Sequence, residues 1–169
     1  LTPSQSADWD KVVSAMIFHT PAFSHLMFTL LDKDGLDDVA MFTDKVPMAA
    51  TDGKCLMINP TSFFSKEMTL ANRLLVTCHE VLHVVFEHII YSYKFNLTGK
   101  VPFKDGKSLP YEHDLMNKAA DYIVNATLIA GKIGEMPTGQ WQGLYDPTIT
   151  PDGNADLLDV YRSAHPRAG

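Results

Sequence analysis

Hydrophobic side chains recur three and four positions apart in three long segments of the chain, residues 4–18, 70–90 and 114–130. This spacing places them on one face of an α-helix, so each segment is predicted to be helical. Between residues 81 and 90 the chain is apolar on nearly every side of the predicted helix. A helix of that kind is surrounded by other elements, so we expect the second segment to form the centre of the fold.

Shorter elements are predicted between and after these helices. Thr20 followed by Pro21 is typical of a helix start, and that helix should run through Leu31. Two strands and a closing helix are expected at residues 39–43, 55–59 and 154–164. Residues 95–113 are polar and rich in Gly and Pro, which predicts a surface loop that could act as a lid, and residues 135–153 are predicted to be irregular.

The composition is that of a soluble globular protein. The 169 residues are 46% hydrophobic and 20% charged, which suits one domain with its own core. A net charge of −6, without any cluster of Lys or Arg, argues against nucleic-acid binding. No apolar run reaches the roughly 20 residues of a membrane span, and no signal peptide is evident. Cys55 and Cys78 are interpreted as reduced core residues, and a cytoplasmic location is expected.

One motif inside the predicted central helix carries chemistry. His79-Glu80-Val81-Leu82-His83 has the pattern H-E-x-x-H. Residues four apart on a helix point in nearly the same direction, so the two imidazoles can bind one metal ion. Glu80 lies beside the first of them, where its carboxylate can act as general base on a metal-bound water. The alternative is a pair of partly buried histidines hydrogen-bonded to the backbone, with Glu80 at the helix surface.

A catalytic zinc site usually has three protein ligands, so the motif needs a third. The candidates are His88, Glu87, His113, Asp114 and Asp121. His88 faces away from His79, and the chain lacks the Gly that would bring a later histidine back to the site. Asn117, Asp121 and Asn125 recur every four residues along the otherwise apolar third helix. A buried polar stripe needs a polar partner, which favours Asp121 as a ligand over an aspartate that only caps a helix or forms a salt bridge.

Several sequence elements occur in an order that resembles a known family. They are Thr51-Asp52-Gly53, Asn59-Pro60, the H-E-x-x-H motif and Ala119-Ala120-Asp121-Tyr122-Ile123-Val124-Asn125. This series is similar to the putative metallopeptidase domain of bacteria and phages, a zincin-like group, over roughly residues 35 to 165. The resemblance implies His79, His83 and Asp121 as ligands of one zinc ion, and Glu80 as the base. It also implies an α+β, zincin-like fold, mostly helical, in which a small β-sheet packs over the central helix.

The same resemblance predicts the domain organisation. Residues 1–34 are expected to form an N-terminal helical segment packed on the core, and residues 35–169 the zincin-like domain, together one compact unit. In proteins of that group this domain is often followed by a von Willebrand factor A-like domain, which this chain lacks. The chain begins at Leu1 rather than Met, so the native protein could extend beyond these residues, and a partner protein could contribute.

The predicted function is that of a zinc metallopeptidase, which hydrolyses a peptide bond in a protein or peptide substrate with a metal-bound water activated by Glu80. A candidate edge strand, to which an extended substrate could add, comprises Cys55, Leu56, Met57, Ile58 and Asn59. Candidates for stabilising the oxyanion or orienting the site are Tyr122, Tyr145, His113 and Asn125. Two alternatives stay open: a non-catalytic scaffold or binding domain that zinc stabilises, and a metal-dependent hydrolase of non-protein amides.

Overall fold

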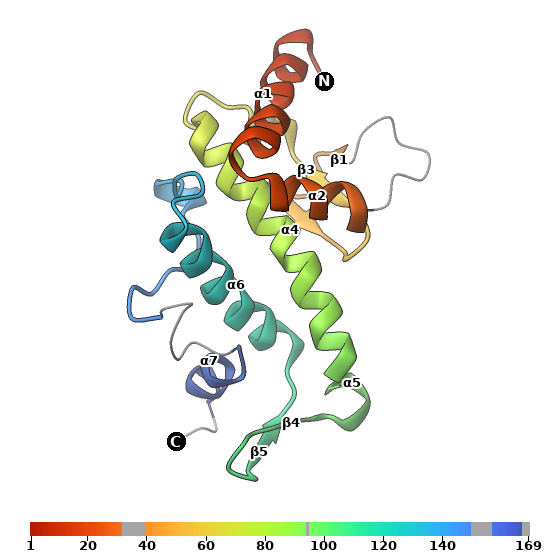
Figure 1. The fold of residues 1–169 in the computed structure, drawn as a ribbon, viewed down its shortest axis with the longest axis vertical. Helices are drawn as coiled ribbons and strands as arrows, with labels where there is room; N and C mark the ends of the chain where they lie inside the picture. Colours follow the sequence, from red (N-terminus) through yellow and green to blue (C-terminus); the bar gives the residue numbers. More distant parts are fainter. Residues whose placement is uncertain (32–39, 94, 150–156, 167–169) are drawn as a thin grey trace.

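Two long helices form the centre of the molecule. The computed structural model describes residues 1–31, 40–93, 95–149 and 157–166. Helices α4 (Leu70–Tyr93) and α6 (His113–Ala130) run antiparallel to each other along an elongated molecule (Figure 1). The hydrophobic spacing predicted both helices, with ends that differ from the observed ones by at most three residues. Together with two small sheets they make the fold α+β, as the sequence predicted.

Two N-terminal helices, α1 (Pro3–His19) and α2 (Pro21–Leu30), pack against the upper half of α4 in Figure 1. Helix α1 begins with a capping box, in which the Thr2 hydroxyl accepts a hydrogen bond from the amide of Gln5. The Gln5 side chain in turn accepts one from the amide of Thr2. The buried face of α1 is formed by Trp9, Val12 and Met16. Both helices were predicted, and the structure confirms them to within about a residue.

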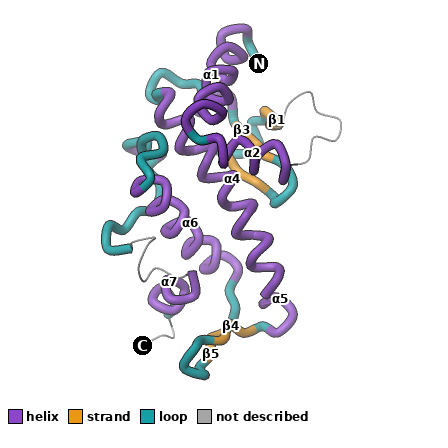
Figure 2. Tube along the Cα trace, in the orientation of Figure 1, coloured by secondary structure: helices purple, strands orange, loops and turns teal. Residues whose placement is uncertain are grey.

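A three-stranded sheet lies beside the upper half of α4 (Figure 2). Its strands are β1 (Ala40–Phe42), β2 (Ala49–Thr51) and β3 (Leu56–Ile58), in the order β1-β3-β2. Strand β3 pairs in parallel with β1 and antiparallel with β2. The prediction that residues 55–59 form a substrate edge is therefore wrong, because β3 is the central strand and its backbone groups are paired on both sides. The edge that contacts α4 is β2, which the sequence analysis did not predict.

The start of α4 is fixed by reciprocal hydrogen bonds. A one-turn helix, α3 (Pro60–Phe63), follows β3 and leads toward α4. The Thr69 hydroxyl accepts a hydrogen bond from the amide of Asn72, and the Asn72 side chain accepts one from the amide of Thr69, so Thr69 caps the helix. Below this cap the helix buries an apolar face made of Leu74, Leu75, Cys78, Val81 and Val84. Neither Cys55 nor Cys78 forms a disulfide.

The lower part of the molecule has a small core of its own. It contains α5 (Phe95–Thr98), the hairpin of β4 (Lys100–Pro102) and β5 (Ser108–Pro110), and the closing helix α7 (Leu157–Ala164). The buried members of this core are Phe95, Val101, Met116, Ala119 and Tyr161. Residues 95–113, predicted to be a surface loop that could act as a lid, instead contain α5 and a hairpin packed on the lower end of α6 (Figure 2). Among the described residues, no helix combines the length and apolarity needed to cross a membrane.

Residues 134–145, which we call the covering segment, return from the end of α6 to the upper half of α4. Gly134 has a φ of +67°, and a Cβ there would lie 2.5 Å from the carbonyl oxygen of Ala71. The amide of Glu135 donates to that same carbonyl, at 3.0 Å. The segment continues through a 3-10 helix, η1 (Gly139–Trp141), and is irregular elsewhere. Only glycine allows so close an approach of one backbone to another, so Gly134 positions the segment on α4.

Candidate metal centre

His79 and His83 of α4 face Asp121 of α6. The Nε2 atom of His79 lies 3.0 Å from Oδ1 of Asp121, and the Nε2 atom of His83 lies 2.5 Å from the same oxygen. The two imidazole rings are next to each other, with centroids 4.6 Å apart. One potential ligand atom from each of the three residues lies within 4.8 Å of the others. The antiparallel pairing of α4 and α6 therefore brings together the three residues that the sequence analysis proposed as ligands.

Asp121 and His79 shift each other's pKa. Burial alone would raise the pKa of Asp121, but hydrogen bonds from His79 and His83 and their positive charge hold that pKa far below its ordinary value of 3.8. Burial opposes a charge on His79, but the hydrogen bond to Asp121, the negative charges of Glu80 and Asp121 and a hydrogen bond to Asn125 outweigh it. The pKa of His79 is consequently raised above its ordinary value of 6.5. The carboxylate is thus held ionised, as a metal ligand has to be.

Asn125 holds the other side of His79. Its Oδ1 atom lies 2.7 Å from Nδ1 of His79, and its Nδ2 donates a hydrogen bond to the carbonyl oxygen of Leu144, at 2.7 Å. The Asn125 side chain is almost completely buried. With the Nδ1 proton of His79 directed at Asn125, Nε2 is the ring nitrogen that faces Asp121, and its lone pair becomes available to a metal ion once the proton it shares with Asp121 is lost. Asn125 therefore sets the tautomer of His79, in the way that outer partners orient metal-binding histidines.

Glu80 lies next to the three candidate ligands, but its carboxylate accepts no hydrogen bond from the described residues. Glu80 lines two pockets, both of which are also lined by His79. Burial raises the pKa of Glu80, while the positive charges of His79 and His83 oppose that rise. The carboxylate is therefore free to take a proton from a water molecule next to the three candidate ligands.

The donor set fits a zinc ion. Ligands at about 2.1 Å from a tetrahedral zinc lie about 3.4 Å from one another. The separations of 3.0 and 2.5 Å between Asp121 and the two imidazoles are shorter, because the carboxylate bridges both rings by hydrogen bonds. A small outward movement of Asp121 would bring its distances from the two imidazoles to the spacing of a zinc site. Two imidazoles and one carboxylate are a ligand set of catalytic zinc sites, which keep one coordination position for water.

A polar groove of about 240 Å³ runs past the centre. Its walls are β2 on one side and the two helices on the other, and its lining residues are Ala49, Ala50, Thr51, His79, Glu80, His83, Glu87, Asn117 and Asp121. β2 pairs only with β3 among the described residues, so its other edge is free on the side of the sheet that contacts α4. An extended chain in this groove could reach both β2 and the three candidate ligands.

The other residues proposed from the sequence lie elsewhere. Tyr122 and Tyr145 line neither pocket beside Glu80, and Tyr145 is exposed. His113 contacts Tyr111 and Asn117 at the start of α6, two helical turns before Asp121. Asp114 lies in the first turn of α6, where Glu112 holds the capping position. The side chain of His88 lies outside the described part of the chain.

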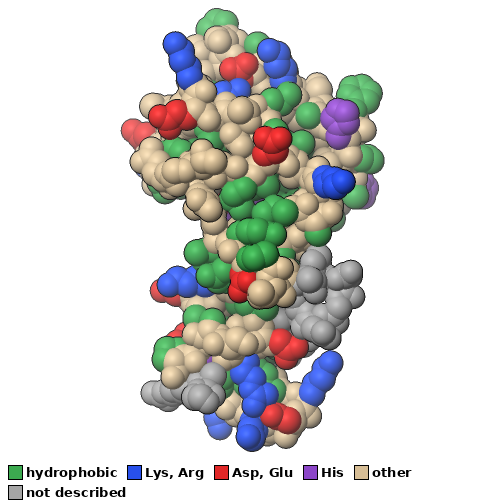
Figure 3. Space-filling model, turned by 90° about the vertical axis from the view of Figure 1, so that its left-hand side faces the viewer, with side chains coloured by type: hydrophobic (Ala, Val, Ile, Leu, Met, Phe, Trp, Pro, Cys, Tyr) green, Lys and Arg blue, Asp and Glu red, His purple; other side chains and the backbone are tan. Residues whose placement is uncertain are grey.

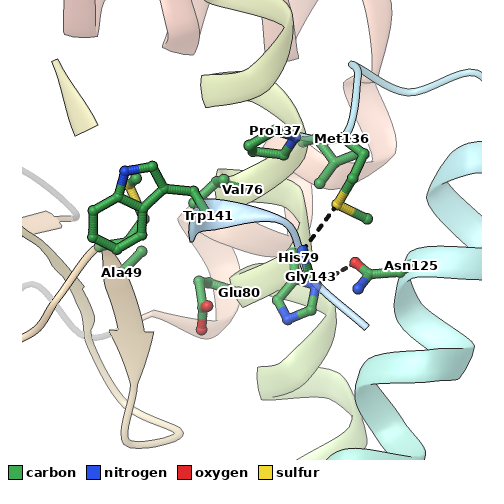
Figure 4. A pocket seen from close by; sticks show the side chains of 11 residues that line it. Ala49, Val76, His79, Glu80, Asn125, Met136, Pro137, Trp141 and Gly143 are labelled. Carbon is green, nitrogen blue, oxygen red and sulfur yellow. Dashed lines mark hydrogen bonds between the residues drawn. The ribbon is translucent and has the colours of Figure 1, made fainter. Parts of the chain in front are cut away.

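The sequence analysis missed the residues contributed by β2 and by the covering segment. Met136, Pro137, Trp141 and Gly143 of the segment line the second pocket beside Glu80. Figure 4 shows Trp141 across this pocket from Glu80, and Gly143 between His79 and Met136. No motif or periodicity marks these positions, because long-range hydrogen bonds to Asn125 and Ala71 place them.

Comparison with known proteins gives one match. A family model described as "Putative metallopeptidase domain" covers residues 4–145. The matched region includes α1 and α2, which lie before the expected span of residues 35–165, and it ends before α7. It contains all three candidate ligands, Glu80 and the covering segment. No curated protein and no solved structure matches the chain significantly.

Proposed function

Because this chain belongs to the putative metallopeptidase domain family, we propose that it is a zinc-dependent peptidase. The proposal rests on one observation. His79, His83 and Asp121 lie close enough to bind one metal ion, and the Glu80 carboxylate lines the groove beside them. The family supports a metal-dependent peptidase in general, and the two imidazoles with one carboxylate favour zinc among the divalent ions.

His79, His83 and Asp121 would hold the metal ion, and Asn125 would keep the His79 ring in the binding orientation. A zinc ion held by these residues would supply a Lewis acid for the carbonyl of the scissile bond and would lower the pKa of a water molecule to about 7. Glu80 would remove a proton from that water as it attacks the carbonyl carbon. The same carboxylic acid would then give the proton to the leaving amine, so that Glu80 serves first as base and then as acid.

The substrate would bind as an extended strand along the free edge of β2. This edge replaces the strand at residues 55–59 as the proposed substrate edge, because only β2 borders the groove next to Glu80. Backbone hydrogen bonds to an added strand do not depend on side-chain identity, so this contact would orient many different peptides. Selectivity would then have to come from side-chain pockets.

The test combines metal content with turnover. Wild type and Glu80→Gln should each contain about one zinc per chain, and only wild type should cleave peptides in a degenerate library. A matched control is Glu67→Gln, which makes the same change at an exposed position outside both pockets. Asp121→Asn should lose most of its zinc, whereas Asp114→Asn on the same helix should keep it. Full turnover by Glu80→Gln would contradict the proposal, and a wild type that binds zinc without cleaving any peptide or small amide would favour a scaffold role.

A further inference from the structure

The second pocket beside Glu80 has mostly apolar walls, whereas the groove is polar. It lies between α4, β2 and the covering segment, and its volume is about 170 Å³. We propose that this pocket is a specificity subsite, which takes one large apolar side chain from the substrate residue next to the scissile bond. The inference rests on the proposed peptidase function and adds to it the class of substrate.

The chemistry of the walls points to an apolar occupant. Three polar residues, His79, Glu80 and Asn125, form the side next to the metal centre. The remaining walls consist of Met48, Ala49, Leu75, Val76, Met136, Pro137, Trp141 and Gly143. Figure 4 shows Trp141, Val76 and Ala49 on one side of this space and Met136 and Pro137 on another. A buried polar group would find few partners among these side chains, whereas an apolar group would lose contact with water on entering.

The size of the pocket selects among apolar side chains. An apolar cavity of about 150 Å³ is large enough to bind benzene. A pocket of about 170 Å³ can therefore accept the side chain of Phe, Leu or Met. Ala or Gly at the same substrate position would leave most of the space unfilled. Each methylene that fills such a pocket changes the specificity ratio by about 10-fold or more, so the preference for large apolar residues should be clear.

The position of the pocket ties its occupant to the bond that is cleaved. His79, Glu80 and Ala49 line both the pocket and the polar groove. A peptide in the groove would pass Glu80 at its scissile bond, and Glu80 also lines the pocket. A residue that directly flanks this bond would lie close enough to place its side chain there, since the pocket and the groove share His79, Glu80 and Ala49.

The roof of the pocket is held by the same residue that orients His79. Asn125 binds the Leu144 carbonyl, and a Cβ at Gly143 would lie 2.9 Å from the Asn125 amide nitrogen. The Gly143 amide donates to the sulfur of Met136, at 3.3 Å, which closes the segment on itself (Figure 4). Hydrogen bonds from Asn125 and within the covering segment therefore hold this wall of the pocket in place.

The first test is a digest of a degenerate peptide library, with cleavage sites read by mass spectrometry. Wild type should cut next to Phe, Leu or Met at least 10-fold faster than next to Ala or Gly. Val76→Phe, which fills the pocket, should reverse this preference, and Trp141→Ala, which enlarges it, should extend the preference to larger side chains. Leu144→Ala is the matched control, because this side chain is exposed and lines neither space. Cleavage without preference, unchanged in both pocket variants, would overturn the subsite and leave the peptidase standing.

A binding measurement separates the subsite from catalysis. The chain has two tryptophans, Trp9 and Trp141. With 5-fluorotryptophan in the zinc-loaded Glu80→Gln protein, N-acetyl-phenylalanine amide and N-acetyl-leucine amide should shift the fluorine signal of Trp141. The signal of Trp9, buried against Phe42 and Phe63, should stay in place as a reference. N-acetyl-glycine amide should bind at least 10-fold more weakly. Selective shifts without any peptide cleavage by wild type would keep the subsite and overturn the peptidase, and no shift with any amide would overturn the subsite.

Discussion

The Asn125 side chain of α6 bridges His79 of α4 and the backbone of Leu144, with two hydrogen bonds of 2.7 Å. One amide group thus joins the candidate metal centre to the covering segment. An asparagine can do this because its oxygen accepts from an imidazole N–H while its nitrogen donates to a carbonyl. The orientation of a candidate ligand and the position of the pocket roof therefore depend on the same side chain.

Replacing Asn125 by Ala should weaken zinc binding by about 10- to 100-fold, because His79 loses the partner that fixes its ring and tautomer. The dissociation constant can be measured by competition with a chromophoric chelator. Asn117→Ala is the control on the same helix, since Asn117 lines the groove but contacts His113 rather than a candidate ligand. Equal zinc affinities for the two variants would show that Asn125 does not orient His79.

The stability of the metal-free protein should depend on pH in a predictable direction. The pKa of His79 is raised above 6.5, so its stabilising contribution is complete below about pH 6.5 and is lost as the pH rises through the pKa of the folded state. The pKa of Asp121 is lowered below 3.8, so its contribution is complete above about pH 4 and is lost as the pH falls further. From this pair alone, the metal-free protein is most stable between about pH 4 and pH 6.5.

Zinc should change this profile, because it competes with the protons on the two imidazoles. Urea unfolding at pH 5, 6, 7 and 8, with a chelator and with zinc, measures both profiles. The stabilisation by zinc should grow from pH 5 to pH 8. A zinc effect that is the same at every pH would mean that the histidines do not bind the ion.

Gly134→Ala should lower the free energy of unfolding by about 3 kcal/mol. The new Cβ would meet the Ala71 carbonyl in addition to requiring a left-handed backbone. Gly106→Ala separates these two effects, because Gly106 has a φ of +84° but open space around it. This control should cost only about 1 kcal/mol, from the backbone conformation alone. Thermal unfolding of both variants is the measurement, and losses of the same size would argue against a close approach at Gly134.

The two cysteines should differ in reactivity. Cys78 is fully buried, and burial raises the pKa of its thiol to about 12. At pH 8 roughly one molecule in 10,000 would carry the reactive thiolate at this position. Cys55 is partly exposed and forms no disulfide. A disulfide reagent such as Ellman's reagent should therefore label one thiol quickly in the folded protein and the second only after unfolding. Fast labelling of both would mean that α4 opens readily in solution.

The central helix and the candidate ligands could be predicted because each depends on spacing within one helix. Leu74, Cys78 and Val81 repeat at helical intervals, and so do His79 and His83. Asp121 could be proposed because Asn117 and Asn125 lie one turn on each side of it in a buried helix. Local periodicity is a strong signal when a long segment carries it.

The sheet order and the covering segment could not be predicted in this way. Strand β2 is only Ala49–Thr51, too short for an alternating pattern, and its place at the edge depends on pairing with β3. The segment at residues 134–145 has no period at all. Its course is set by contacts with Ala71 and Asn125, which lie far from it in the chain. Tertiary contacts of this kind leave no local trace in a sequence.

Helix α7 lies outside the segment that the family model matches, residues 4–145, but the fold depends on it. The Tyr161 hydroxyl donates a hydrogen bond to the Pro110 carbonyl and accepts one from the amide of Glu112. It thus binds the last residue of the hairpin and the N-cap residue of α6. Residues 4–145 alone would leave that amide without its partner. They would also expose Phe95, Val101 and Met116 at the lower end of the molecule. In the space-filling view, hydrophobic side chains already gather midway along one face (Figure 3). A fragment cut at the family boundary should therefore aggregate, and α7 has to be retained for the protein to be purified as a monodisperse species.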